Sequence, residues 1–187
     1  MLFTRDDTYA AFMMDHAAGN HPESLALAAD LHMILSPEAA REAFAWSIIG
    51  GALLEAEAPE AVAAQPEPER RYHKRKRTRA GATAILDAAG QGVPWKRGIF
   101  AVPYHPVGVP GGRLMKLSPG QSVPRHGHTA TEATVVIQGE LRDEFGHYRK
   151  GDLMLGEPGM HHKPVAAGED ACICYVAEPP RFAWRLQ

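Results

Sequence analysis

The sequence predicts an α+β protein of two domains, in which a small N-terminal helical bundle precedes an all-β barrel or sandwich. Residues 5–56 are rich in Ala, Leu, Met and Glu and poor in strand-forming residues, which favours helices. From Val93 onward, short segments rich in Val, Ile and Tyr are separated by Gly and Pro turns, as in all-β domains. We therefore assign residues 1–57 to the helical domain, 58–92 to a linker and 93–187 to the β domain.

Residues typical of helix starts predict where the second and third helices of the first domain begin. Asn20 can cap a helix that begins near Pro22, and Ser36 before Pro37 gives the same signal for a third helix. Gly50 and its neighbour Gly51 are expected to weaken that third helix. The apolar residues expected to hold the helices together are Leu31, Leu35, Phe44 and Ile48.

The segment RRYHKRKRTR within the expected linker carries seven Lys or Arg in ten positions. A nucleic-acid patch is one interpretation, and it would give binding with a steep salt dependence. The interpretation that we adopt is a solvated linker, or an arm that docks on the acidic helical domain, so direct nucleic-acid binding is not expected. A short helix is expected at residues 83–89.

The net charge of −2 conceals a strong asymmetry along the chain. Residues 1–69 carry twelve Asp or Glu against two Arg, whereas residues 70–187 carry eighteen Lys or Arg against ten Asp or Glu. An acidic domain suits a basic partner surface, although a solvated acidic helix face would have the same composition.

Several features predict a cytoplasmic protein. No apolar run approaches the length of a membrane span, and the N-terminus lacks the basic-then-apolar pattern of a secretory signal. The two cysteines, Cys172 and Cys174, are too close in sequence for an ordinary disulfide, which fits a reducing compartment. They share one strand face and could sense oxidants from there, but buried and inert thiols are the interpretation that we favour.

The stretch PRHGHTATEATVV, from Pro124 to Val136, concentrates metal-ligand residue types. His126 and His128 lie two apart, so a strand would present both on the same face, and Glu132 follows one short turn later. A further ligand can come from the stretch EPGMHHKP, where either of two adjacent histidines would point inward. Three imidazoles and a carboxylate suit Zn, Fe, Ni or Cu, and the carboxylate also permits Mn. A tetrahedral arrangement would make a closed structural site, whereas a larger coordination number would leave room for a substrate or oxygen.

The spacing of these residues resembles the two motifs of the cupin family. The first motif runs from Gly120 to Gly139 through His126, His128 and Glu132, and every fixed position matches. The second runs from Gly151 through Glu157-Pro158-Gly159 to His162, with glutamate where proline is usual and no asparagine at its end. The resemblance implies a jelly-roll barrel, the double-stranded β-helix, and it selects His162 over His161. It implies one divalent metal held by His126, His128, Glu132 and His162; we expect zinc, with Fe, Mn or Ni as alternatives.

The chain also resembles the ChrR family of anti-sigma factors in both halves. In the first half the likeness lies in AAG at residues 17–19, LHMILSPEAAREAF at 31–44 and GGALLE at 50–55. In the second half it lies in HGHTATE, VIQGELRDE and CICYVAEPP. The resemblance implies that the helices bind an extracytoplasmic-function sigma factor and keep it from RNA polymerase. It also implies that the cupin takes part in a response to singlet oxygen or related oxidative stress.

One departure from that family concerns metal in the helical domain. The family's helical domain holds zinc through an early histidine and a His-x3-Cys-x2-Cys motif. Here His32 is present, but Ser36 and Ala39 stand at the cysteine positions, and Asp7 or a neighbour stands at the early histidine. Serine and alanine cannot replace thiolate ligands, so we expect no zinc in residues 1–57.

The function predicted from these observations is that of an anti-sigma regulator. Its helices would sequester a sigma factor, and its metal-binding cupin would sense an oxidant or small ligand. The alternative is a cupin metalloenzyme, a dioxygenase or another metal-dependent enzyme, that carries a relic anti-sigma domain. The regulator is the hypothesis that we adopt, and it assigns no catalytic residue.

Overall fold

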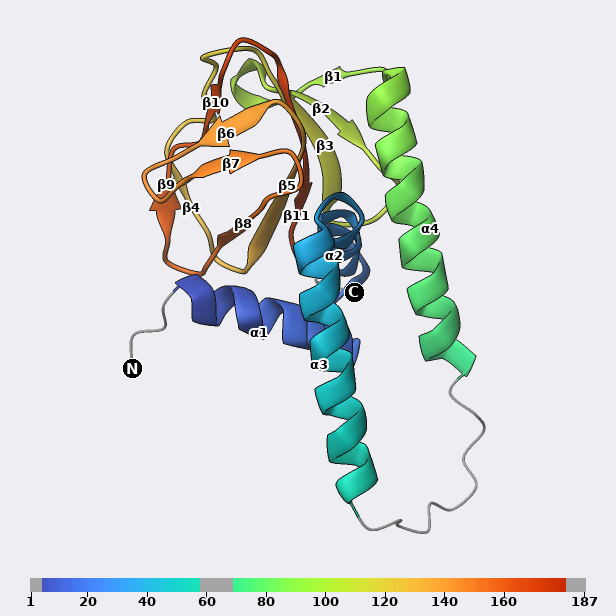
Figure 1. Ribbon diagram of the computed structural model, residues 1–187. Coiled ribbons are helices and arrows are strands. Elements are labelled where there is room, and N and C mark those ends of the chain that lie inside the picture. Colours follow the sequence, from blue (N-terminus) through green and yellow to red (C-terminus); the bar gives the residue numbers. More distant parts are fainter. Residues whose placement is uncertain (1–4, 58–68, 181–187) are drawn as a thin grey trace, which may run out of the picture.

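The computed structural model describes residues 5–57 and 69–180, and it shows a helical region followed by a β barrel (Figure 1). The helices are α1 (Arg5–Ala18), α2 (Glu23–Leu35), α3 (Pro37–Ala56) and α4 (Glu69–Gln91). The predicted α+β class, with helices first and an all-β domain second, is confirmed. None of the described helices is long and apolar enough to cross a membrane.

The barrel consists of short antiparallel strands in three sheets. The strands are β1 (Lys96–Arg97), β2 (Pro103–Pro106), β3 (Gly112–Leu117), β4 (His126–Gly127), β5 (Glu132–Gln138), β6 (Glu140–Arg142), β7 (His147–Arg149), β8 (Leu153–Gly156), β9 (His161–His162), β10 (Val165–Ala167) and β11 (Cys172–Ala177), with a 3-10 turn at Ile99–Ala101. The largest sheet has the order β1-β2-β3-β11-β5-β8, and the smaller sheets are β10-β6-β7 and β4-β9. Strands distant in sequence are neighbours, as in the pairing of β11 with both β3 and β5.

Alternation along β5 separates the two faces of the large sheet. Glu132, Thr134 and Val136 are buried and share one face, because successive side chains of a strand point to opposite sides. Val136 belongs to the core of the barrel interior, whereas Val135 belongs to the core shared with the helices. The sheet is therefore buried on both faces.

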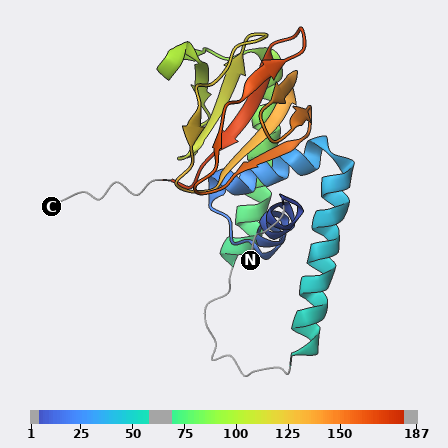
Figure 2. The same cartoon turned by 90° about the vertical axis from the view of Figure 1, so that its left-hand side faces the viewer.

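The helical region packs on the outer face of the large sheet through α2. One hydrophobic cluster contains Leu27 and Leu31 of α2 together with Val135 of β5 and Tyr175 of β11. Figure 2 shows α2 directly below the barrel, with α1 on its other side. The helices and the barrel thus share a continuous core.

Helix α4 occupies most of the segment that we predicted to be a linker. Residues 69–91, which we expected to be mainly linker, form a continuous helix that packs against α2. Its buried residues recur at helical spacing, at Thr78, Ala82, Ile85 and Ala89. The short helix predicted at residues 83–89 lies within α4, but the prediction gave weight to the charge of residues 70–79 and did not extend the helix through them. Residues 58–68 lie outside the described part of the chain.

Helix α3 differs from the prediction in its packing. Ser36 caps it as expected, because its Oγ accepts a hydrogen bond from the Ala39 N–H (3.3 Å). Gly50 and Gly51 do not interrupt it. Phe44 and Ile48, predicted to lie in the core, are 67% and 57% exposed.

These exposures follow from the position of α3. Only its first part contacts α1 and α2, with Ala39 and Ala43 buried, and the rest projects beyond the other helices (Figure 1). Leu31 is fully buried, as expected. At the start of α2 the side chain of Asn20 does not cap the helix but donates to Asp15 (3.2 Å).

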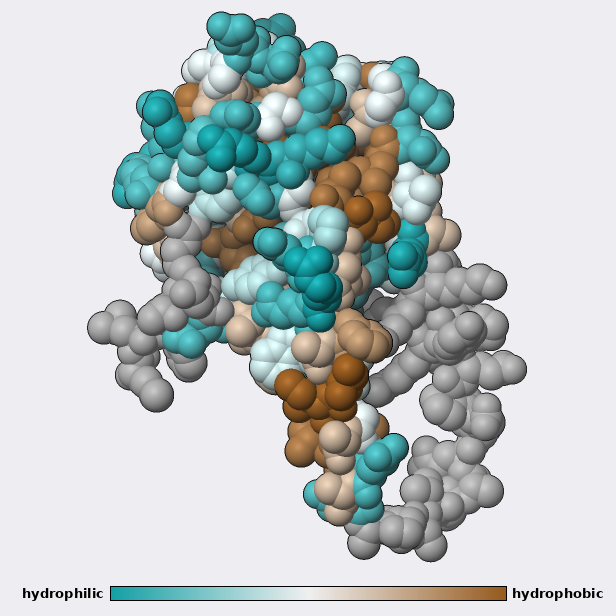
Figure 3. Space-filling view, in the orientation of Figure 1, coloured by the Kyte–Doolittle hydropathy of each residue, from teal (hydrophilic) through white to brown (hydrophobic). Residues whose placement is uncertain are grey.

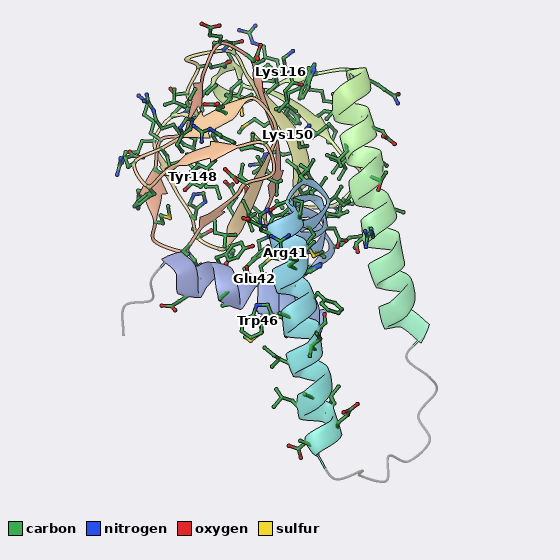
Figure 4. The ribbon with its side chains drawn as sticks, in the orientation of Figure 1. Arg41, Glu42, Trp46, Lys116, Tyr148 and Lys150 are labelled. Carbon is green, nitrogen blue, oxygen red and sulfur yellow. The ribbon has the colours of Figure 1, made fainter. Side chains whose placement is uncertain are left out.

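His32 and its neighbours form a hydrogen-bonded cluster at the position where the family resemblance implies zinc. His32 Nδ1 lies 2.6 Å from the carbonyl oxygen of Gly151, so it carries a proton and donates. Burial lowers the pKa of His32, so the ring is neutral and its Nε2 accepts from the Tyr9 hydroxyl (2.9 Å). Burial, reinforced by the charge of Glu42, raises the pKa of Tyr9 to about 12. Glu42 is labelled on α3 in Figure 4, on the side of the helix that faces α1. One imidazole therefore joins α1 and α2 to the barrel.

We expect Leu31→Ala to lower the free energy of unfolding by about 2–5 kcal/mol, because it removes a fully buried side chain from the core shared by helices and barrel. Ile48→Ala should change it by no more than about 0.5 kcal/mol, because Ile48 is already exposed. Urea unfolding of the two variants measures both values. Equal destabilisation by both substitutions would contradict the described packing of α3.

Candidate metal centre

The four predicted metal ligands converge at one end of the barrel interior. His126 lies in β4, His128 follows that strand, Glu132 begins β5 and His162 ends β9. One possible ligand atom from each lies within 4.8 Å of the others, and this is the one such group among the described residues. The pairing of β4 with β9 sets His126 directly opposite His162.

His161 lies on the surface, outside the cluster. It is exposed while His162 is fully buried, because adjacent strand residues face opposite ways. Its ring packs over Gly127, where an added Cβ would fall 2.6 Å from His161 Nε2. The structure therefore brings together the four residues that the motif spacing selects.

Hydrogen bonds fix the protonation of two of the imidazoles. His126 Nδ1 faces the carbonyl oxygen of Pro124 (2.9 Å), and His162 Nδ1 faces the Asp143 carboxylate (2.9 Å). A carbonyl or a carboxylate oxygen accepts, so each Nδ1 carries a proton, and it is Nε2 of each ring that can present a lone pair to a metal. These two Nε2 atoms are 3.2 Å apart, and His128 Nε2 is 2.9 Å from that of His162.

Two lone pairs that face each other across 3.2 Å repel unless a cation lies between them. Two nitrogen ligands, each about 2.1 Å from one metal ion, lie about 3.0 Å apart if they subtend a right angle at the ion and about 3.4 Å apart in a tetrahedron. The two separations that involve His162 Nε2, 2.9 Å and 3.2 Å, are close to these values and are compatible with ligands around one ion. The donor set could hold a divalent metal, and the residues present fit one.

Asp143 belongs to the candidate site but was missed by sequence reasoning. It lies in the turn after β6, and its side chain is fully shielded from solvent where it meets His162. Burial alone would raise its pKa, but hydrogen bonds from His162 and from the N–H groups of Phe145 and Gly146 lower it below the ordinary value. The charged carboxylate orients His162 so that its Nε2 faces the other imidazoles, as a carboxylate partner of a metal-binding histidine would. Its one sequence signal is its place in VIQGELRDE, and nothing there connects it to a histidine 19 residues later.

Glu132, the carboxylate of the cluster, is buried and lies close to other charged groups. Burial raises the pKa of Glu132 to about 7, and the nearby Arg113 opposes that rise (3.7 Å). Arg113 also pairs with Glu178 (3.1 Å). Burial and the neighbouring imidazoles lower the pKa of His128 to about 4, so its ring is neutral and available as a ligand near neutral pH.

Backbone contacts position His128. Its N–H donates to the carbonyl of Met160 (3.2 Å), and its carbonyl accepts from the N–H of Gly159 (2.9 Å). Gly156 of β8 leaves the room for its ring, because a Cβ there would fall 2.7 Å from His128 Nε2. A larger residue at this position would displace the imidazole.

Cys172 and Cys174 are free thiols, fully buried in the core of the barrel interior. The hydrogen bond with Cys172 and complete burial raise the pKa of the Cys174 thiol. Neither belongs to the group of possible metal ligands. Their burial was predicted, and their inertness towards oxidants stays a prediction.

These features define a class: a cupin barrel with a cluster of three histidines and a glutamate, joined to an N-terminal helical region. Residues 103–181 match the family model described as "ChrR Cupin-like domain". The chain is 30% identical to the anti-sigma-E factor ChrR of Cereibacter sphaeroides over 195 residues, which cover 92% of this chain and 89% of that protein. It is also similar to the ChrR chain in the crystal structure of Rhodobacter sphaeroides SigE in complex with the anti-sigma ChrR. There the TM-score is 0.71 at 30% identity, covering 90% of this chain and 96% of the other.

The alignment with ChrR extends over both the helical region and the cupin. The chain belongs to the ChrR family of anti-sigma factors.

We expect zinc affinity to rise with pH up to about 7 and then to level off. Glu132, with its pKa raised to about 7, must lose a proton before it can bind the ion, whereas His128 is already neutral. Calorimetric titration of zinc at pH 6 and pH 8, in buffers of different ionisation enthalpy, measures the affinity and the protons released. Glu132→Gln should bind more weakly and lose part of the pH dependence. A wild-type affinity that is equal at pH 6 and pH 8 would contradict the assignment of Glu132 as a ligand.

Proposed function

We propose that this chain is a cytoplasmic anti-sigma factor whose helical region binds an extracytoplasmic-function sigma factor and keeps it from RNA polymerase. The observation that carries the proposal is the similarity to ChrR, a protein whose solved structure is a complex with SigE. That similarity covers 90% of this chain and therefore includes the helices as well as the cupin.

The surface of α3 supports this proposal. Its outer part exposes five large apolar side chains, at Phe44, Ile48, Ile49, Leu53 and Leu54. Figure 3 shows the resulting brown patch on the projecting part of the helix. Large apolar patches on soluble proteins mark interaction sites, because leaving them in water costs free energy. The acidic composition of residues 1–69 also suits a basic partner.

We further propose that the cupin holds zinc at His126, His128, Glu132 and His162, and that an oxidant or small ligand acts there. Zinc fits a site of neutral imidazoles and one carboxylate. A cavity of about 430 Å³ borders Arg113, Met115 and Val123 and could admit a small molecule beside the site. Phe100 lines it with a left-handed backbone (φ 57°), which costs a non-glycine residue conformational energy.

A chain of polar contacts links the metal centre to α2. Glu132 lies near Arg113, and Arg113 pairs with the Glu178 carboxylate. The backbone carbonyl of Glu178 accepts a hydrogen bond from Ser24 Oγ in the first turn of α2 (2.6 Å). The Tyr175 hydroxyl donates to the carbonyl of Ser24 (3.1 Å). A change of charge at the metal centre would thus act on the helix that supports α3.

The first test is to purify the tagged chain from its host and identify the bound proteins by mass spectrometry. A sigma factor should be recovered in near-equal amount. Ile48→Asp should then weaken binding of that sigma factor by about 30-fold or more, because it places a charge in the centre of an apolar interface. The thermal stability of the variant should stay unchanged, since Ile48 is largely exposed.

Ser118→Asp is the matched control for Ile48→Asp, since it adds the same charge at an exposed turn of the barrel. It should bind as the wild type does. Recovery of the chain alone, from stressed and unstressed cells, would refute the anti-sigma proposal. Equal binding by wild type and Ile48→Asp would refute the assignment of the α3 surface.

His128→Ala should lose the metal and abolish the response of sigma-dependent transcription to singlet oxygen, because it removes a buried ligand. His161→Ala, which alters an exposed histidine beside the site, should keep both. Elemental analysis of the purified proteins and a reporter gene in stressed cells measure the two effects. A normal response in His128→Ala cells would show that the metal has no part in sensing.

A further inference from the structure

The strongest unexplained feature of the helical region is a cavity of about 280 Å³ to which all four helices contribute. The residues that matter for its chemistry are His16, Asp30, Met33, Phe44, Ser47 and Arg79. The cavity lies next to the exposed apolar face of α3, because Phe44 belongs to both.

Asp30 provides the unusual chemistry of this cavity. Its side chain is 9% exposed, and its Oδ1 lies 3.3 Å from His16 Nε2. Its Oδ2 is buried and has no hydrogen-bond partner, and among the described residues no other buried side-chain oxygen or nitrogen is in this state. A buried carboxylate oxygen without a partner costs free energy, since it has lost water and gained nothing in return.

The other residues that line the cavity indicate what kind of group could bind the Asp30 carboxylate and offset this free-energy cost. Met33 and Phe44 are apolar and would cover the aliphatic stem of a side chain. The Asp30 Oδ2, which has no partner, would accept a hydrogen bond from a cationic group at the end of that stem. A lysine or arginine side chain has this combination of stem and charge. Arg79 of α4 lines the cavity, but no ion pair within 4.0 Å joins it to Asp30 in the described part of the chain.

We propose that Asp30 anchors the sigma factor by receiving one of its lysine or arginine side chains in this cavity. The inference rests on the proposed anti-sigma function and adds to it a charged contact at the base of the apolar α3 surface. The free chain carries the carboxylate at a cost to its own stability, and the complex satisfies it.

The test is Asp30→Asn in the full-length chain, with Asp87→Asn on the exposed face of α4 as the matched control. Affinity for the sigma factor that copurifies with the wild-type chain is measured by calorimetry, and stability of the free chain by thermal unfolding. Asp30→Asn should weaken binding by about tenfold or more. Its melting temperature should be equal to or higher than that of the wild type, because a buried charge has been removed. Asp87→Asn should change neither quantity.

A second measurement identifies the partner side chain. Each lysine and arginine of the sigma factor is replaced by methionine and tested against wild type and Asp30→Asn. One replacement should weaken binding to the wild type but add no further loss to Asp30→Asn, because both changes remove the same contact. Additive effects for every replacement would overturn the inference.

The other possible results distinguish a failure of the Asp30 anchor from a failure of the proposed anti-sigma function. If the wild type binds a sigma factor and Asp30→Asn binds it equally well, the anchor is refuted while the anti-sigma function stands. If Asp30→Asn melts at a lower temperature and its affinity falls only as far as its folded fraction, Asp30 is a structural residue and the inference is overturned. If the wild type binds no sigma factor, the proposed function itself fails.

Discussion

A helix that is buried on every side must find internal partners for each polar group that it carries, and α2 is such a helix. Its nine consecutive residues from Ser24 to His32 are all buried, between the sheet on one side and the other helices on the rest. Ser24 and His32 satisfy the requirement by bonding to backbone carbonyls of the barrel. These two bonds, together with the shared apolar core, hold the helical region on the cupin. Asp30 is the exception, because one of its carboxylate oxygens is left without a partner.

The same packing suggests how the helical region stays ordered where the family pattern of zinc ligands is incomplete. Residues that the resemblance assigns to zinc here have other partners: His32 bonds to Gly151 and Tyr9, and Ser36 caps α3. A zinc site would hold α1, α2 and α3 together by coordination. In this chain α2 is instead attached to a large sheet, and the fully buried Leu31 belongs to a core that includes barrel residues. The helical region therefore shares its core with the cupin and is not held by its own helix contacts alone.

The features that could be predicted from the sequence are those that follow from the spacing of residues within short motifs. The four metal-site residues lie in short strands and turns, so the motif predicts which of them face one another. Asp143 could not be found in this way, because its contact with His162 forms only when β6 and β9 come together in the folded barrel. β6 and β9 belong to different sheets, so this contact depends on how the two sheets pack, which the sequence pattern does not state.

The periodic spacing of apolar residues predicted where helices form, but it did not predict which helix faces pack within the chain. Phe44 and Ile48 have the spacing of a core stripe, and the structure leaves them on the surface. A helix face that packs within the chain and one that packs on a partner obey the same burial physics, so the pattern alone does not distinguish them. The reverse error occurred in α4, where a basic composition concealed a stripe of small residues that contacts α2.

Arg113 provides a physical route by which the candidate metal centre could influence the apolar surface of α3. It lies between two carboxylates, 3.7 Å from Glu132 and 3.1 Å from Glu178. A metal ion bound by Glu132 would compete with Arg113 for that carboxylate, which leaves the guanidinium to Glu178. Glu178 in turn accepts the hydrogen bond from Ser24 at the start of α2, and α3 begins directly after α2 ends. Because packed helices shift as rigid units, a small change at Ser24 would be carried along α2 to the base of the apolar α3 surface. The ion pair in the barrel and the proposed docking surface on α3 would thereby move together.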